Sequence, residues 1–229
     1  MPQPLPYRTV IFDLDGTLVD SVLDVVGAVQ KVLVSSGLPE LDPAQFPLLL
    51  GEGSRIRTRT AFALSGVTLT EAELDAKLVE VAERYSEALL THTKPFPGIP
   101  ALLAELSAQG VTCAVCTNKD EASARKIVEA LGLAPYLQDT CGSDSFGVQK
   151  PHPGHILHLL ERMGESTEGA IMVGDSVHDI LAAHRAFLPA AFVSWGYGKA
   201  GQGEEKPEYC CDSAEDLAKV LGLRTAALA

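Results

Sequence analysis

Short apolar runs that end in polar or acidic residues recur along this chain. Runs of about 4–8 residues bounded by turn formers are typical of buried strands. Strands are therefore predicted near residues 9–13, 111–116, 170–174 and 190–194, with a short further strand before Gly142. Helices are predicted between them, near residues 98–109, 120–131, 153–163 and 179–186. This alternation predicts an α/β fold with a doubly wound parallel sheet and a Rossmann-like core.

The segment between residues 21 and 93 follows a different pattern, because it has helical spacing and no strand-like run bounded by turns. Two apolar stripes recur at helical spacing: Val22, Val25, Val29 and Leu33, then Leu74, Leu78, Val81, Tyr85 and Leu89. Thr70 and Glu73 have the spacing of a capping box before the second stripe. The sequence thus predicts an α/β catalytic core of residues 1–20 and 94–229, with an inserted α-helical cap domain of residues 21–93.

Polar residues that can carry chemistry directly follow three of the predicted strands. Asp13 and Asp15 end the first strand, and they point the same way because side chains alternate along a strand. Thr117 and Asn118 follow the second strand, and Asp175 follows the third. In an open α/β sheet, ligands bind outside the carboxyl ends of the strands. We therefore expect these side chains to meet at one edge of the sheet.

Two further charged residues lie close to this set in the sequence. Lys150 lies beside Pro151 in the segment Lys150-Pro151-His152-Pro153, whose prolines restrict the backbone. Asp179 follows Asp175 by one helical turn, and two interpretations of it stay open. In the first, it orients Lys150 or a metal-bound water. In the second, it is an acid at a helix N-terminus, where the helix dipole favours negative charge.

Together, the four polar segments resemble the four motifs of the haloacid dehalogenase superfamily of phosphohydrolases in order and spacing. The matching segments are Asp13-x-Asp15-Gly16-Thr17, Thr117-Asn118, Lys150 and Gly174-Asp175-Ser176-x-x-Asp179. The similarity extends from about Tyr7 to Tyr197. A glycine-rich turn at residues 51–55 and the stretch Trp195-Gly196-Tyr197-Gly198 favour the phosphoglycolate phosphatase branch of this superfamily.

This resemblance implies a phosphatase that acts on a small phosphorylated metabolite similar to phosphoglycolate. It implies that Asp13 attacks phosphorus to form an aspartyl phosphate, while Asp15 protonates the leaving alcohol and then activates water. The Thr117 hydroxyl, the Asn118 backbone amide and Lys150 are expected to hold the phosphoryl oxygens.

The cofactor that the resemblance implies is Mg²⁺, held by the side chains of Asp13 and Asp175 and by the backbone carbonyl of Asp15. A cation is needed because an attacking carboxylate repels a phosphate dianion. At about 4 Å and an effective dielectric constant near 20, each pair of like charges costs about 4 kcal/mol.

The cap is expected to close over the site and to read the leaving group, as the small helical lid does in the family that the chain resembles. Arg55 and Arg59 are four residues apart and therefore share one helix face. Either arginine is a candidate to bind the anionic remainder of the substrate. The alternative, a basic and solvated helix face, stays open.

Two other functions compete with hydrolysis. A sugar phosphate mutase resembling β-phosphoglucomutase uses the same aspartate pair but returns the phosphoryl group to the sugar. A phosphate-responsive binding module has no use for Asp15 as a proton carrier. The acid at Asp15 suits an alcohol leaving group, which disfavours the dehalogenase branch.

Length and charge limit the class of protein. With 229 residues, 46% of them hydrophobic, the chain can bury a substantial core. The formal net charge of −12 argues against nucleic acid as a partner. No stretch approaches the roughly 20 apolar residues of a membrane helix, and the N-terminus has no signal-peptide pattern. We expect a cytoplasmic monomer or homodimer that does not contact membranes.

Three details complete the expectations. The five cysteines are expected to be structural. Cys113 and Cys116 are three apart on a predicted strand and so face opposite ways, which disfavours a shared ion or a disulfide. His155 and His158 are expected at the surface or at its boundary. Proteins of the family that the chain resembles commonly have glycine where it has Phe187, and phenylalanine is expected to resist a left-handed backbone there.

Overall fold

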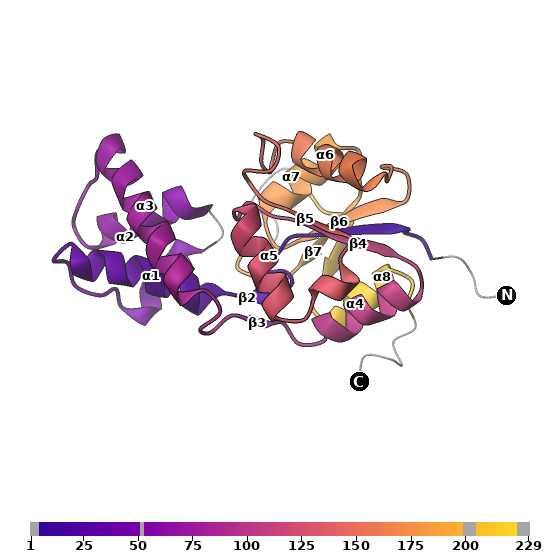
Figure 1. Ribbon diagram of the computed structural model, residues 1–229, viewed down its shortest axis with the longest axis horizontal. Coiled ribbons are helices and arrows are strands. Elements are labelled where there is room, and N and C mark those ends of the chain that lie inside the picture. The colour runs from indigo at the N-terminus through magenta and orange to yellow at the C-terminus, as the bar shows by residue number, and fades with distance from the viewer. Residues whose placement is uncertain (1–4, 51–52, 199–204, 224–229) are drawn as a thin grey trace. The chain divides into compact units, whose positions relative to one another are not determined.

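The computed structural model describes residues 5–50, 53–198 and 205–223. It divides into two compact units, drawn in Figure 1. The core unit comprises Met1–Asp20 and Lys94–Ala229, and the helical unit comprises Ser21–Thr93. Among the described residues, no helix combines the length and the apolar character that crossing a membrane requires.

The core unit is built on a six-stranded parallel sheet in the order β5-β4-β1-β6-β7-β8. Its strands are β1 (Thr9–Phe12), β4 (Thr112–Cys116), β5 (Asp139–Cys141), β6 (Ala170–Gly174), β7 (Ala190–Val193) and β8 (Tyr209–Cys211). All four residues of β1 are buried, as expected for a central strand covered on both faces. The predicted doubly wound parallel sheet is confirmed. Strand β8 was not predicted, and only one of its three residues is buried.

Helices cover both faces of this sheet (Figure 1). α6 (Gly154–Met163) and α7 (Val177–Arg185) pack on one face, and α4 (Ile99–Ala108), α5 (Glu121–Ala130) and α8 (Ala214–Val220) lie on the other. A single-turn 3₁₀ helix, η2 (Ala134–Tyr136), follows α5. The first face buries Ile11, Met172 and Phe192 of the strands against Ile156 and Ile180 of the helices. Burying such a side chain contributes about 1.5–3 kcal/mol.

The register of the central strands brings their carboxyl ends to one level. Phe12 pairs with Val115 of β4 and with Val173 of β6. The chain order reverses at β1, where one neighbouring strand is β4 and the other is β6. This is the switch point at which open α/β sheets bind ligands. Asp13, directly after β1, therefore lies at the centre of that edge.

Two short strands mark where the chain leaves and re-enters the core unit. β2 (Val19–Asp20) pairs antiparallel with β3 (Lys94–Pro95). The segment that leaves the core unit is thus paired with the segment that returns to it, and both strands belong to the core unit.

The helical unit consists of α1 (Val22–Ser35), the 3₁₀ helix η1 (Pro43–Leu49), α2 (Gly53–Leu64) and α3 (Glu71–Ala88). Thr70 and Glu73 form the predicted capping box at the start of α3. The buried face of α1 differs slightly from the predicted apolar stripe. Val26 and Val32 are buried, whereas Val22 and Val25 are only partly buried.

A buried carboxylate ties the two ends of the helical unit together. Asp24 of α1 accepts hydrogen bonds from the backbone nitrogens of His92 and Thr93 at 2.9 Å, and from the Thr93 hydroxyl at 2.6 Å. The segment that returns to the core unit is therefore fixed to the first turn of α1.

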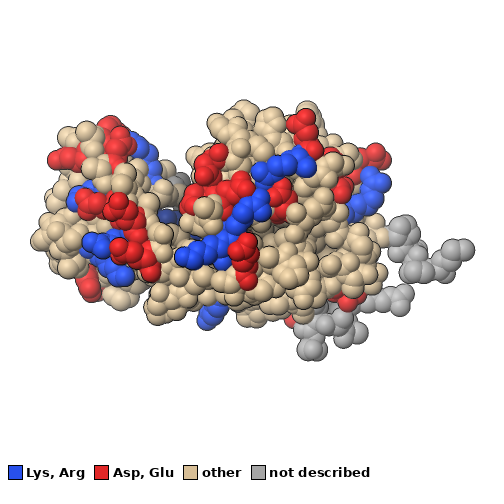
Figure 2. Space-filling view, viewed as in Figure 1, with Lys and Arg blue, Asp and Glu red and all other residues tan. Residues whose placement is uncertain are grey.

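Surface charges are mixed on the visible face of each unit, where basic side chains lie beside acidic ones (Figure 2). In the core unit, Arg125 pairs with Glu121 and Asp139, and Arg162 pairs with Asp139 as well. Such pairs, which are partly open to solvent, contribute little to stability.

The turn after α7 corrects one expectation. Phe187 adopts a left-handed conformation with φ 60°, although it has a Cβ atom. Two hydrogen bonds close the turn, from Phe187 N to His184 O and from Leu188 N to Ala183 O. The Phe187 side chain is 93% exposed, so it has no packing contacts to lose in this conformation. The turn therefore forms with a local backbone strain that glycine would avoid.

We predict that Phe187→Gly raises the free energy of unfolding by about 1 kcal/mol, because relief of the left-handed strain exceeds the added chain entropy. Urea denaturation measures this. Phe187→Ala is the matched control, since alanine removes the ring but keeps the Cβ atom. A gain with alanine as large as that with glycine contradicts a backbone origin.

Candidate active site

Three carboxylates meet at the carboxyl edge of the sheet. Asp13 follows β1, Asp175 follows β6, and Asp179 lies in the first turn of α7. One carboxylate oxygen of each lies within 4.8 Å of the others. The strand register brings Asp13 and Asp175 together, as the sequence predicted, and the short turn between β6 and α7 adds Asp179 to them.

Lys150 lies between two of these acids. Its Nζ is 3.0 Å from Oδ1 of Asp13 and 2.6 Å from Oδ1 of Asp179, and its side chain is only 2% exposed. Burial alone would lower the pKa of Lys150, but attraction to Asp13 and Asp179 raises that pKa above its ordinary value. The lysine is therefore held as a cation.

Asp179 makes contacts that fit both interpretations from the sequence. One of its oxygens accepts from Lys150, and Oδ2 accepts from the Ser176 backbone nitrogen and hydroxyl at 3.0 and 2.6 Å. It therefore caps α7 and also holds the lysine. Gly174 leaves room for this arrangement, because a Cβ atom there would lie 2.3 Å from Cγ of Asp179.

The site carries more negative charge than Lys150 balances. Burial raises the pKa of Asp13 to about 6; Lys150 opposes this rise, while Asp179 adds to it. Burial and repulsion from Asp13 and Asp179 raise the pKa of Asp175 to about 7. Such an excess of buried carboxylates favours a cation.

Asp175 is fixed by a backbone loop that the sequence analysis did not connect with it. Its Oδ2 accepts from the backbone nitrogens of Tyr197 and Gly198, at 2.7 and 3.2 Å. Gly16 and Gly196 allow this close approach, because a Cβ atom on either would lie within 2.5 Å of Asp175. The carboxylate orientation is therefore set by main-chain groups.

The same loop contacts the first motif. Trp195 donates through its indole nitrogen to the carbonyl of Thr17 at 3.1 Å, and the Tyr197 hydroxyl contacts Oδ1 of Asp20 at 3.0 Å. The stretch Trp195-Gly196-Tyr197-Gly198 thus links the segments that follow β1 and β6 within the core unit.

Thr117 and Asn118 occupy the turn after β4, close to Lys150. Thr117 is buried, and its backbone nitrogen donates to the carbonyl of Cys141 at 3.1 Å. The Asn118 side chain makes two hydrogen bonds with the Lys150 backbone, at 2.9 Å to its carbonyl and 3.0 Å from its nitrogen. This amide holds the lysine in place, a role that the sequence did not indicate.

Asp15 pairs with a lysine that the sequence analysis did not single out. Lys119 Nζ lies 2.8 Å from Oδ2 of Asp15. Lys119 directly follows Thr117-Asn118 at the end of β4, so its position next to the second motif was the signal available in the sequence.

The two candidate arginines of the helical unit have acidic partners within that unit. Arg55 contacts Glu71 at 2.7 Å and Asp75 at 2.6 Å, and Arg59 contacts Glu71 at 2.7 Å. Their side chains are about half exposed. Of the glycine-rich turn before them, residues 51–52 lie outside the described residues.

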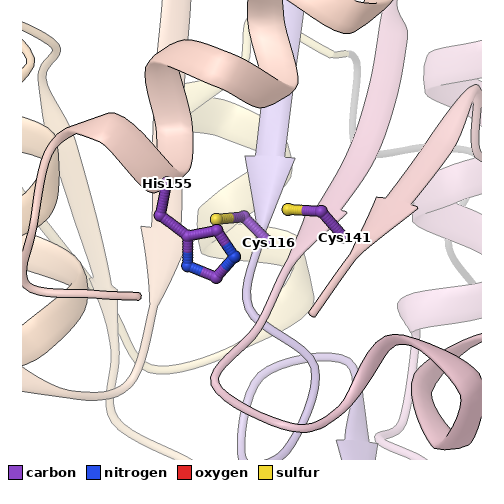
Figure 3. A group of neighbouring side chains, drawn as sticks. All are labelled: Cys116, Cys141 and His155. Carbon is purple, nitrogen blue, oxygen red and sulfur yellow. The ribbon is translucent and has the colours of Figure 1, made fainter. Parts of the chain in front are cut away.

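Beneath the edge of the sheet lies a buried group that the sequence analysis did not recognise: Cys116, Cys141 and His155 (Figure 3). His155 is fully buried, so its expected place at the surface was wrong. Its Nδ1 accepts from the Lys150 backbone nitrogen at 3.3 Å, and its Nε2 contacts the Gly142 carbonyl at 3.0 Å. Both ring nitrogens are thus engaged, and the imidazole joins Lys150 to the loop after β5.

Comparison with known proteins identifies relatives along most of the chain. The model of the haloacid dehalogenase-like hydrolase family matches residues 10–193. A phosphoglycolate phosphatase of Agrobacterium fabrum is 39% identical over 212 residues, which are 92% of this chain and 91% of the relative. One of Aquifex aeolicus is 36% identical over 214 residues, covering 93% and 96% of the two chains.

A solved structure agrees with these matches. The crystal structure of a predicted phosphoglycolate phosphatase from Haemophilus somnus 129pt is 29% identical and has a TM-score of 0.83. The likeness covers 94% of this chain and 98% of that one. The fold, the strand-end acids and the family match agree with one another. The chain is a member of the haloacid dehalogenase-like hydrolase family, in the branch that resembles the phosphoglycolate phosphatases.

Proposed function

We propose that this protein is a Mg²⁺-dependent phosphatase that hydrolyses a small phosphate monoester similar to phosphoglycolate, through an aspartyl phosphate on Asp13. The observation that carries the proposal is the placement of Asp13 and Asp15 at one strand end, each beside a lysine ammonium group. Two phosphoglycolate phosphatases that are 39% and 36% identical to this chain support the substrate class.

Asp13 is the proposed nucleophile. Its carboxylate lies at the end of the central strand, and the Lys150 ammonium lies 3.0 Å away to offset repulsion from an incoming phosphate. Attack forms a bond between the Asp13 carboxylate and phosphorus as the ester oxygen departs, so one displacement becomes two easier ones.

Asp15 is the proposed general acid and base. It lies two residues beyond Asp13 and is 24% exposed, so it can reach both the leaving oxygen and an incoming water. It gives its proton to the leaving alcohol in the first step and takes one from water in the second.

Thr117, Asn118 and Lys150 are the proposed phosphate-binding groups. The Thr117 hydroxyl and the Asn118 backbone amide lie in the turn after β4, and the Asn118 side chain holds the Lys150 backbone at 2.9 and 3.0 Å. Preorganised donors of this kind stabilise the charge that develops on phosphoryl oxygens.

The donor set fits Mg²⁺. Asp13 and Asp175 offer hard carboxylate oxygens close together, and burial, with repulsion from neighbouring acids, raises the pKa of both. The Asp15 backbone carbonyl is the proposed third ligand, and Asp179 is proposed to orient Lys150. A bound Mg²⁺ would supply positive charge that offsets repulsion between the carboxylate and the phosphate.

The helical unit is the proposed lid that closes over the site and reads the leaving group. Arg55 and Arg59 keep their proposed role toward the anionic end of the substrate. In the structure both arginines bind Glu71, so this role requires the substrate to replace or share an acidic partner.

Phosphate release from a panel of esters with Mg²⁺ tests the proposal. We expect release from phosphoglycolate, a loss of at least about 1,000-fold in kcat/KM with Asp13→Asn, and a loss of about 100- to 10,000-fold with Asp15→Asn. Glu129→Gln, at an exposed position on α5, is the matched control and should keep wild-type activity. Conversion of β-glucose 1-phosphate to glucose 6-phosphate without phosphate release supports the mutase instead.

Metal binding should depend on pH in a direction set by the site acids. The pKa values of about 6 for Asp13 and about 7 for Asp175 lie above their ordinary value. The folded protein therefore holds protons that the unfolded chain releases from about pH 4 upward. When a chelator keeps the site free of metal, the stability gained from these bound protons is present at low pH. It is lost as pH rises through about 7.

Added Mg²⁺ should therefore raise Tm little at about pH 5 and much more at about pH 8, because it binds the deprotonated carboxylates. Differential scanning calorimetry with and without chelator measures the shift. Asp175→Asn should remove most of the shift at the higher pH. An equal shift at both pH values, or one that survives in the variant, contradicts this site.

A further inference from the structure

The Asp15–Lys119 ion pair lies on the accessible side of the site. Lys119 Nζ contacts Oδ2 of Asp15 at 2.8 Å, and the two side chains are 8% and 24% exposed. The Lys150 side chain is 2% exposed and lies between Asp13 and Asp179. A ligand that enters the core unit can therefore reach the Asp15–Lys119 pair more easily than it can reach Lys150.

The backbone of Lys119 is anchored on both sides. Its nitrogen donates to the Thr117 hydroxyl at 3.3 Å, and its carbonyl accepts from the Ser143 nitrogen at 2.9 Å. The side chain thus starts from a fixed point in the loop that carries the proposed phosphate-binding groups. Since Asp15 already holds the ammonium group at 2.8 Å, little conformational freedom needs to be lost when it binds an anion.

We propose that Lys119 selects substrates in which the leaving alcohol carries a carboxylate next to the ester carbon. This inference rests on the proposed phosphatase function and names the residue that determines its substrate class. To protonate the leaving oxygen, Asp15 must lie within about 2.6–3.2 Å of it. In a 2-phosphocarboxylate, a single methylene separates that oxygen from the carboxylate, which therefore also lies next to Asp15 and within reach of Lys119.

Charge supports this assignment. The chain has a formal net charge of −12, so an anionic substrate needs local positive charge. Lys150 contacts the acids beside the reacting phosphorus, whereas Lys119 contacts Asp15, the proposed proton donor to the leaving alcohol. A contact of Arg55 or Arg59 with the same carboxylate would add to that of Lys119. Lys119 is placed to attract a second anionic group at the leaving-alcohol side of the reaction.

The competing explanation is that Lys119 serves only to orient Asp15. In that case its removal slows hydrolysis of every ester by the same factor. Carboxylate recognition predicts a selective loss, and the ratio of kcat/KM for two matched esters separates the two roles. 2-Phosphoglycolate and 2-hydroxyethyl phosphate are suitable, since the second has a neutral hydroxymethyl group in place of the carboxylate.

In Lys119→Met we expect the ratio of kcat/KM for 2-phosphoglycolate over 2-hydroxyethyl phosphate to fall about 10- to 100-fold, as for loss of a hydrogen bond to a charged group. The change should lie chiefly in KM. Lys119→Arg should restore part of the ratio, because it keeps the charge. Lys126→Met, which removes an exposed charge from α5, should keep the wild-type ratio.

Binding provides a readout without turnover. In the Asp13→Asn background, calorimetry should show 2-phosphoglycolate binding that Lys119→Met weakens by a similar factor. An equal loss for both esters, or unchanged binding, overturns the role of Lys119 and leaves the phosphatase proposal standing. Failure of the wild-type protein to hydrolyse either ester overturns both.

Discussion

The buried contact of Lys150 with Asp13 and Asp179 is the interaction on which the rest of the site depends. Removing charges from water costs several kcal/mol per ion, and only well-placed partners offset it. Here one ammonium group faces two carboxylates at 3.0 and 2.6 Å, with Asp175 close by. Burial, with repulsion among these acids that one ammonium group does not fully offset, raises the pKa of Asp13 and Asp175. The excess of negative charge at this edge supports the Mg²⁺ site proposed above.

Several parts of the fold serve to keep this arrangement fixed. The register of β1 with β4 and β6 brings the strand ends together, and the Asn118 amide holds the Lys150 backbone. Glycines permit backbone to approach Asp175 closely, and its Oδ2 receives two main-chain hydrogen bonds. These contacts orient the acids before any ligand arrives, as preorganised electrostatic catalysis requires.

The sheet, its flanking helices and the meeting of the strand-end acids could be predicted from the sequence, because apolar runs and parallel-strand topology determine them. Contacts between distant residues could not. The hydrogen bond from Tyr197 to Asp175 spans 22 positions, and the role of the Asn118 side chain depends on where the Lys150 backbone lies. The burial of His155 was missed because its two hydrogen-bond partners, the Lys150 backbone nitrogen and the Gly142 carbonyl, are brought to it only by the fold. Phe187 adopts the left-handed turn that closes α7, with its ring in solvent.

The central claim is that Asp13 becomes covalently phosphorylated during turnover. Rapid acid quenching of a reaction with ³²P-labelled substrate, followed by digestion and mass spectrometry, tests this most directly. The account predicts a label on the peptide that contains Asp13, absent in Asp13→Asn and accumulating in Asp15→Asn, where the second step lacks its base. A label on another peptide, or hydrolysis with no labelled peptide in the Asp15→Asn variant, would contradict it.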